Sequence, residues 1–157
     1  MPKLDLEAIP QSNRTGYPAP YDRPVAARWY RRLAPIAGLT AMGASHVVLK
    51  PGGWSSQRHW HAEEDELVVI LSGEAVLVED GGETVLRAGD MAAWPKGVKN
   101  GHHIQNRGTE DCVMIAVSAG DSANDHGEYP DIDLKFDERV SGNAYLHKDG
   151  TPYPAKG

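Results

Sequence analysis

Cysteine, basic residues and long apolar runs are all scarce in this 157-residue sequence. Its single cysteine, Cys112, excludes a disulfide within the chain. The longest apolar runs, such as residues 67–71, have the length of a strand and fall far short of the ~20 residues of a transmembrane helix. With 16 Lys and Arg against 22 Asp and Glu, the net charge of −6 argues against a general nucleic-acid binder. Since the N-terminus also lacks the apolar core of a signal peptide, we expect a cytoplasmic protein with neither a membrane nor a nucleic-acid partner.

Glycine and proline, in contrast, are abundant, and they divide the sequence into short apolar segments. The 17 glycines and 11 prolines alternate with segments of strand length at residues 45–50, 58–61, 66–71, 74–79, 84–87, 90–94, 102–106 and 113–118. Asp80-Gly81, between two of these segments, is a strong signal for a tight β-hairpin. Short strands at regular spacing with glycine turns are typical of a sandwich or small barrel, so we predict an all-β fold.

The chain divides into three expected regions. Residues 1–40 form an N-terminal arm and a short helix, because the prolines of residues 1–24 exclude a regular helix or a central strand there. Residues 25–33 are expected to form two turns of helix, with Pro24 at a favourable first position. Residues 41–120 form the β-barrel. Residues 121–157 are acidic and irregular at their start, and we expect a C-terminal extension without a second core.

Histidine and glutamate residues in this barrel have the pattern of a metal site. His59 and His61 stand two apart in a strand-like segment, so alternation places both imidazoles on one face. Glu66 begins the next strand after a polar turn, and His102, followed by His103, comes about 35 residues later. Three neutral imidazoles and one carboxylate suit a divalent ion of iron, manganese, nickel, copper or zinc, with positions left for water or substrate. The alternative is that these histidines are incidental polar residues of the strands.

Two motifs give the sequence a specific resemblance to the cupin superfamily. The first motif, Gly-x5-His-x-His-x3,4-Glu-x6-Gly, is complete as Gly53, His59, His61, Glu66 and Gly73. The second, Gly-x5-Pro-x-Gly-x2-His-x3-Asn, is matched by Gly89, Pro95, Gly97, His102 and Asn106. Four residues rather than two separate Gly97 from His102, which leaves His103 as an alternative ligand, but only His102 keeps the final spacing to Asn106.

The resemblance extends over roughly residues 45–118 and implies a double-stranded β-helix, or jelly-roll barrel. It also implies one divalent metal ion inside one mouth of the barrel, held by His59, His61, Glu66 and His102. Beside them, Gln57 has the parity of the two histidines and is expected to point into the barrel near the metal, whereas Trp60 is expected to face outward.

The leading function hypothesis is a metal-dependent enzyme that acts on a small molecule. Dioxygenase chemistry and isomerisation of a sugar derivative are both familiar among similar cupins. No catalytic residue is assigned, although Glu63, Glu64 or Asp65 could supply a general base near the mouth. The alternative is a non-catalytic module that binds or senses a small molecule or a metal.

We predict a homodimer, because the proline-rich arm, the outward Trp60 and the apolar strand faces form more surface than one small barrel can bury. Sedimentation equilibrium at micromolar concentration is expected to give twice the 17.0 kDa of the chain. A species with the mass of one chain would contradict the prediction.

Overall fold

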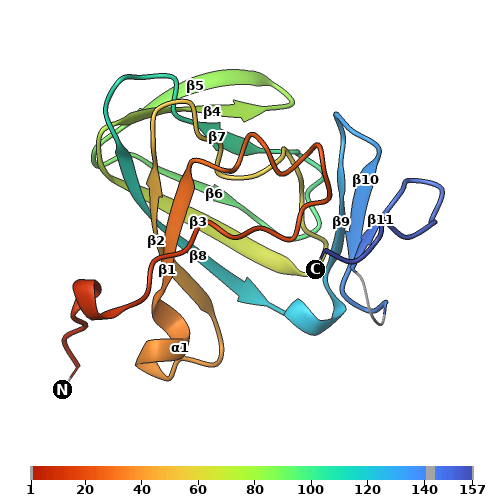
Figure 1. The fold of residues 1–157 in the computed structure, drawn as a ribbon, viewed down its shortest axis with the longest axis horizontal. Coiled ribbons are helices and arrows are strands. Elements are labelled where there is room, and N and C mark those ends of the chain that lie inside the picture. Colours follow the sequence, from red (N-terminus) through yellow and green to blue (C-terminus); the bar gives the residue numbers. More distant parts are fainter. Residues whose placement is uncertain (1, 141–143, 157) are drawn as a thin grey trace.

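Three antiparallel sheets make up the computed structural model, which describes residues 2–140 and 144–156 (Figure 1). The largest sheet has the order β1 (Arg28–Arg32), β2 (Gly43–Leu49), β8 (Cys112–Gly120), β3 (Glu64–Ser72) and β6 (Met91–Trp94). The second has the order β5 (Gly82–Arg87), β4 (Glu74–Glu79) and β7 (His103–Gln105). The third has the order β11 (Tyr145–Leu146), β10 (Leu134–Asp137) and β9 (His126–Tyr129). Helix is confined to η1 (Leu6–Ala8), α1 (Leu33–Ala37) and η2 (Ser122–Asn124) in the described residues.

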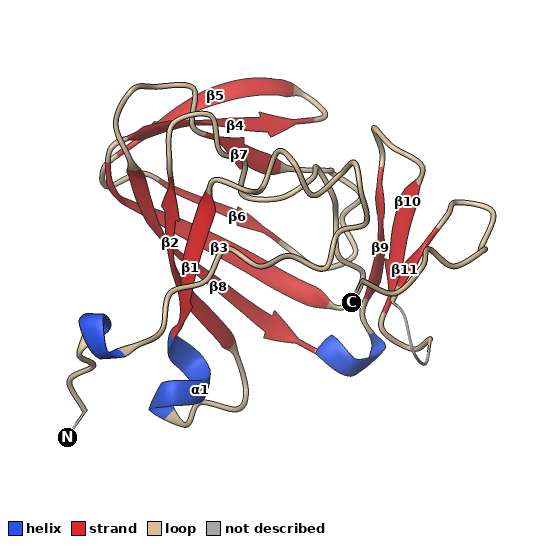
Figure 2. Cartoon of the chain, viewed as in Figure 1, coloured by secondary structure: helices blue, strands red, loops and turns tan. Residues whose placement is uncertain are grey.

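The first two sheets face one another across the main core, which confirms the predicted all-β, double-stranded β-helix fold (Figure 2). Alternate residues of the strands point into this core, as the period of two requires. The core contains Val47, Leu49, Val68, Ile70, Ala75, Leu77, Leu86, Trp94, Ile104, Cys112 and Met114. The tight hairpin expected at Asp80-Gly81 joins β4 to β5, where Glu79 pairs with Gly82. Among the described residues, none of the helices has both the length and the hydropathy of a membrane-spanning helix.

The helix expected at residues 25–33 is wrong. Residues 28–32 instead form β1, which pairs along its whole length with β2, from Arg28 opposite Leu49 to Arg32 opposite Ser45. The arm adds one further bridge, between Ser12 and Tyr30, at this edge of the sheet. An open sheet edge offers a full ladder of hydrogen bonds, and these outweigh the weak helical preference of the segment. Helix α1 begins only after the strand, at Leu33.

The region after residue 120 contains a second hydrophobic cluster, so the expectation of an extension without a core is also wrong. Tyr129, Leu134 and Phe136 of β9 and β10 are buried with Tyr17 and Val25 of the N-terminal arm. Tyr17 and Tyr129 meet edge to face, with ring centroids 5.6 Å apart. The arm and the extension are therefore packed together, and the third sheet stands beside one end of the barrel (Figure 1).

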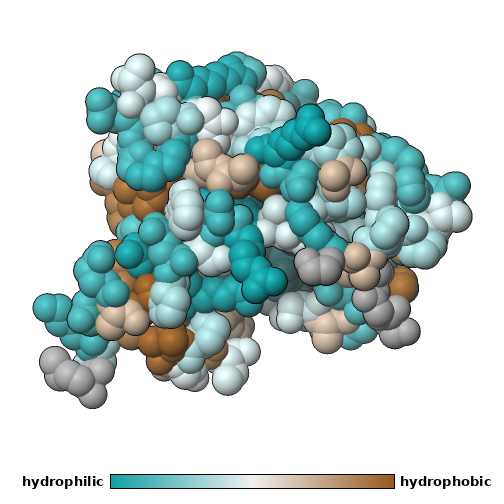
Figure 3. All heavy atoms as spheres, viewed as in Figure 1, coloured by the Kyte–Doolittle hydropathy of each residue, from teal (hydrophilic) through white to brown (hydrophobic). Residues whose placement is uncertain are grey.

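Exposed apolar side chains gather around α1 and the loop that follows it (Figure 3). Ile36 is 59% exposed and Leu39 is 48% exposed. A surface of this kind is compatible with the homodimer, which stays a prediction.

Gly127 of β9 lies very close to the backbone of the segment that contains His59 and His61. A Cβ added there would lie 1.9 Å from the carbonyl oxygen of Trp60 and 2.7 Å from the ring of Phe136. Because the contact with Trp60 is to backbone, it has no side-chain rotation to relieve it. Glycine therefore permits β9 to lie against the segment that contains His59 and His61.

We predict that Gly127→Ala destabilises the protein by about 1–3 kcal/mol, the usual cost of overpacking. Gly81→Ala is the matched control, because its Cβ would meet nothing within 4 Å in the β4–β5 turn. Chemical denaturation of both variants measures the difference. Equal stability of the two would show that β9 does not need the close approach at Gly127.

Candidate metal centre

His59 and His61 lie on a short extended segment that is hydrogen-bonded on both sides. The backbone N–H of His59 donates to His102 O at 3.2 Å, and His102 N–H donates back to His59 O at 3.0 Å. On the other side, Ala62 N–H donates to His126 O of β9 at 2.8 Å. The strand expected at residues 58–61 is thus reduced to one isolated bridge. The side chains of His59 and His61 still lie on one face, as the expected alternation requires, and the centroids of the two imidazole rings lie 4.8 Å apart.

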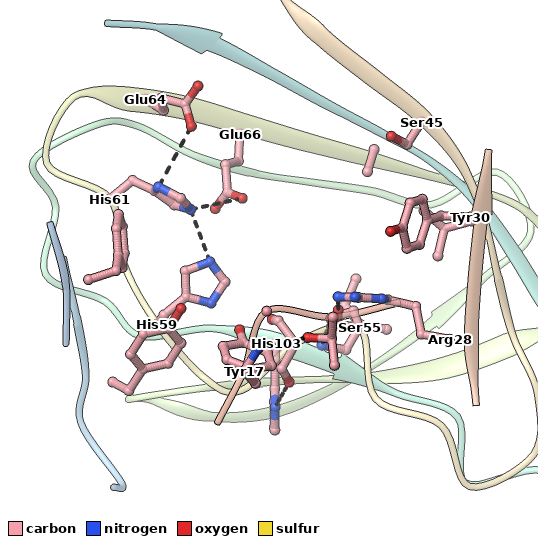
Figure 4. Close-up of a pocket in the computed structure, with 18 of the residues that line it drawn as sticks. Tyr17, Arg28, Tyr30, Ser45, Ser55, His59, His61, Glu64, Glu66 and His103 are labelled. Carbon is pink, nitrogen blue, oxygen red and sulfur yellow. Dashed lines mark hydrogen bonds and ion pairs between the residues drawn. The ribbon is translucent and has the colours of Figure 1, made fainter. Parts of the chain in front are cut away.

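The structure brings the four predicted ligand residues together. Nε2 of His59 lies 2.9 Å from Nε2 of His61, which is 3.3 Å from Oε1 of Glu66 (Figure 4). The other carboxylate oxygen of Glu66, on β3, lies 2.5 Å from Nε2 of His102. Ligand atoms of His59, His61 and Glu66 all lie within 4.8 Å of one another, a group that could hold a metal ion.

In each of the three imidazoles, the second ring nitrogen contacts an oxygen acceptor. Nδ1 of His59 lies 2.8 Å from Gln57 O, and Nδ1 of His102 lies 3.0 Å from Asn100 O. Nδ1 of His61 lies 2.5 Å from a carboxylate oxygen of Asp125. Because carbonyl and carboxylate oxygens only accept, every Nδ1 must carry the proton and donate it. In the neutral tautomer, each Nε2 therefore has a free lone pair: those of His59 and His61 lie in one group with Glu66, and that of His102 faces the second carboxylate oxygen of Glu66.

This arrangement fits a cation. The Nε2 atoms of His59 and His61 are 2.9 Å apart, and Nε2 of His102 is 2.5 Å from a carboxylate oxygen of Glu66. The lone pairs on these atoms repel one another unless protons or a metal ion lie between them. Three imidazole nitrogens and one carboxylate are also a donor set that iron, manganese, nickel, copper and zinc accept. The chemistry of the donors, rather than their spacing in the sequence, makes this cluster a candidate metal centre.

His102 and His103, the two alternatives of the sequence, have different surroundings. The ring of His102 stacks on Trp94, with centroids 4.0 Å apart, and its Nε2 faces Glu66. His103 turns the other way, with Nδ1 2.9 Å from Ser56 O and Nε2 2.9 Å from the amide nitrogen of Gln105. The geometry favours His102 as the fourth member of the cluster.

Asp125 is a member of the candidate site that the sequence did not reveal. It is 2% exposed and receives two hydrogen bonds: the one from His61 Nδ1 and one from Glu63 N–H at 2.9 Å. A carboxylate behind a ligating histidine fixes the ring and raises its basicity. Asp125 lies 64 residues from His61, in the segment read as an extension, and no spacing rule relates the two.

The ionisable groups of the cluster have pKa values that are shifted in different directions. Burial lowers the pKa of His59 to about 4. Burial acts the same way on His61, but the hydrogen bonds to Asp125 and Glu66 outweigh it and raise the pKa of His61 to about 10. Burial would raise the pKa of Glu66, yet hydrogen bonds with His102 and His61 hold that pKa well below its ordinary range. The carboxylate is therefore ionised, and a proton on His61 is what an incoming metal ion must displace.

The cluster opens into a cavity of about 1460 Å³, large enough for a small organic molecule. Gln57 does not line it, contrary to expectation, because its amide donates to Tyr21 O at 2.9 Å on the arm. Glu64 does line it, whereas Glu63 and Asp65 do not. Trp60 does not line it either, and Lys99 Nζ lies 5.3 Å from the centre of its ring.

Comparison with known proteins shows which family and which solved structures the chain resembles. Residues 45–118 match a family model described as a cupin domain. A solved structure of a sugar phosphate isomerase from a cupin superfamily, from Silicibacter pomeroyi, is 38% identical, with a TM-score of 0.89 and 98% of each chain covered. A second, a proposed sugar phosphate isomerase from Acidithiobacillus ferrooxidans, is 25% identical, with a TM-score of 0.71 and coverage of 82% of this chain and 81% of that one.

A curated relative carries a different description. The oxalate-binding protein of Thermotoga maritima is 36% identical over 67 residues. The match covers 43% of this chain and 54% of the relative, so this chain spans about half the length of that protein.

We predict that Asp125→Asn weakens binding of a divalent metal by roughly 10- to 100-fold, the usual effect of losing a partner behind a ligating histidine. The amide group offers only one acceptor, so it loses either the hydrogen bond from His61 or the one from Glu63. Asp121→Asn is the control, because Asp121 is exposed and its carboxylate accepts a hydrogen bond from Asn124, away from the three imidazoles. Competition with a fluorescent chelator measures the affinities, and equal values for the two variants would contradict the role of Asp125.

Proposed function

The chain belongs to the cupin superfamily, and from this premise we propose that it is a metal-dependent isomerase of a small phosphorylated sugar. The observation that carries the proposal is the convergence of three Nε2 atoms on Glu66 at the end of a large cavity. The similarity to a sugar phosphate isomerase over 98% of both chains supports the reaction class.

The residues have separate roles in this proposal. His59, His61, His102 and Glu66 would hold one divalent ion, whose identity among iron, manganese, nickel, copper and zinc is left to metal analysis. When bound, such an ion supplies a Lewis acid for a carbonyl or hydroxyl oxygen. Asp125 keeps His61 in the tautomer and orientation that ligation needs.

Isomerisation of a sugar also needs a group that moves a proton between neighbouring carbons. Two carboxyl groups that line the cavity, those of Glu64 and Glu138, are suited to this. Burial raises the pKa of both, which brings each nearer to the neutral range where general acid–base catalysis is efficient. We assign the proton transfer to one of these two residues.

A second candidate is a non-catalytic module that binds a small dicarboxylate. The partial match to an oxalate-binding protein favours it. Oxalate would bind directly to the metal ion held by the same four residues and would need no proton-transfer group. The dioxygenase alternative of the sequence stays a prediction, and oxygen uptake in the presence of iron(II) tests it.

The test begins with metal analysis of protein purified without chelator, followed by NMR of hexose 6-phosphates and pentose 5-phosphates incubated with it. We expect isomerisation by the wild type and a loss of at least about 100-fold in His59→Ala/His61→Ala, because removal of the ligands removes the Lewis acid. His147→Ala is the control, since His147 pairs with Asp133 outside the cavity.

Thermal melts with and without chelator accompany the assay. Metal at a hundredfold excess over its Kd adds about 2.7 kcal/mol of stability, and the double variant is expected to show none of it. Metal-loaded wild type that binds oxalate saturably and isomerises no sugar phosphate would replace the proposal with the binding module.

A further inference from the structure

A group of arginines lines the cavity that the four candidate metal ligands also line. Arg14, Arg28 and Arg32 line the same cavity as the four candidate ligands. Figure 4 shows Arg28 beside Tyr30 on the opposite side of the cavity from His61 and Glu66. We call Arg14, Arg28 and Arg32 the arginine wall. The cavity therefore has a ligand-bearing end that holds carboxylates and an end that holds cations.

The register of β1 explains two members of this wall. Alternate residues of a strand face opposite sides, so Arg28, Tyr30 and Arg32 point to the cavity together. Arg31 faces away, where its guanidinium donates to Ile9 O at 3.0 Å and lies 3.5 Å from a carboxylate oxygen of Glu7. The structural feature that the sequence did not predict, a strand in place of a helix, is what places the arginines here.

Arg28 has N–H donors that no acceptor in the described residues uses. Its Nη1 donates to Ser55 O at 2.8 Å and its Nη2 donates to Arg14 O at 3.4 Å. Its guanidinium carbon lies 5.4 Å from the ring centre of Tyr30. Its Nε is buried and has no hydrogen-bond partner in the described residues. A guanidinium has five N–H donors, so this one is held in place by backbone oxygens with donors left over.

Charge pairing distinguishes the arginine wall from every other described arginine except the exposed Arg23. Among the described residues, five arginines form ion pairs with carboxylates: Arg31, Arg58, Arg87, Arg107 and Arg139. None of the three arginines of the wall has an ion pair in this part of the structure. Of the three, Arg28 is half-buried, and a half-buried guanidinium without a carboxylate is costly unless an anion meets it. The wall therefore favours an anion from outside the chain.

We propose that the arginine wall, centred on Arg28, is the site that binds the phosphate of a phosphate monoester whose sugar end reaches the metal cluster. Three cations without an ion pair among the described residues suit the double negative charge of a monoester, and the planar guanidinium matches two phosphate oxygens at once. This inference rests on the proposed function for the identity of the sugar end, but the binding of the phosphate depends only on the wall.

Isothermal titration tests it with three probes: fructose 6-phosphate, fructose and inorganic phosphate. In Arg28→Gln we expect the Kd for fructose 6-phosphate to rise at least about tenfold, with the Kd for fructose unchanged, since one charge-assisted pair is lost. Arg28→Lys keeps the positive charge but loses the planar pair of N–H donors, and we expect an intermediate Kd for fructose 6-phosphate. Arg23→Gln is the matched control, because Arg23 is exposed and lies outside the cavity.

A second variant separates binding from folding. Since Arg28 also holds Ser55 O, its loss can lower the melting temperature. Arg32→Gln removes an exposed side chain of the same wall, and we expect it to weaken fructose 6-phosphate binding about threefold or more at an unchanged melting temperature. Both variants binding fructose 6-phosphate as the wild type does would overturn the inference. So would equal wild-type affinities for fructose 6-phosphate and fructose.

His59→Ala/His61→Ala distinguishes the failure of this inference from failure of the proposed function. We expect this variant to keep its affinity for inorganic phosphate, because the wall is intact. Phosphate binding that is lost there but kept in Arg28→Gln would assign the anion to the metal cluster and overturn the inference. Arg28-dependent phosphate binding in a protein without isomerase activity would support the wall and refute only the reaction.

Discussion

The constraint on which the site depends is the hydrogen bond that each of three imidazoles donates through Nδ1. Two of these bonds end on backbone carbonyls, of Gln57 and Asn100, two residues before His59 and His102. The third ends on Asp125, far along the chain. A histidine without such a partner can turn its ring or change its tautomer, and the ligand set then loses its geometry. The bridge between His59 and His102, the burial of Asp125 and the glycine at position 127 all serve to hold these three rings.

Much of the barrel could be predicted from the sequence, because strand period and turn chemistry are local. Asp80-Gly81 predicts its hairpin correctly, and the expected segments from residues 45 to 118 match the strands β2 to β8 within a few residues, apart from residues 58–61. The candidate ligands were found for a related reason. The spacing of His59 and His61 reflects residues that share a face, Glu66 lies near the start of the next strand, and a two-residue insertion before His102 changes only a loop.

What the sequence did not reveal depends on contacts between distant segments. Residues 28–32 carry no local signal that overrides a helix, and only the free edge of β2 makes them a strand. Asp125 reaches His61 because the third sheet packs against the barrel, through aromatic residues from both ends of the chain. Gln57 has the parity of His59, but its amide finds Tyr21 O on the arm, whose path no pattern in the sequence predicts. The position of a residue along a strand predicts which way its side chain points, but it does not predict the hydrogen-bond partner of that side chain.

Asp125 lies directly before β9 in the chain and contacts His61 of the candidate metal centre, so it links the third sheet to that site. An ion ligated by His61 would favour the arrangement in which Asp125 accepts the hydrogen bond of its Nδ1, so metal binding and the packing of this segment would stabilise one another to the same extent. The segment that looks like a tail in the sequence would then contribute to the free energy of metal binding without supplying a ligand.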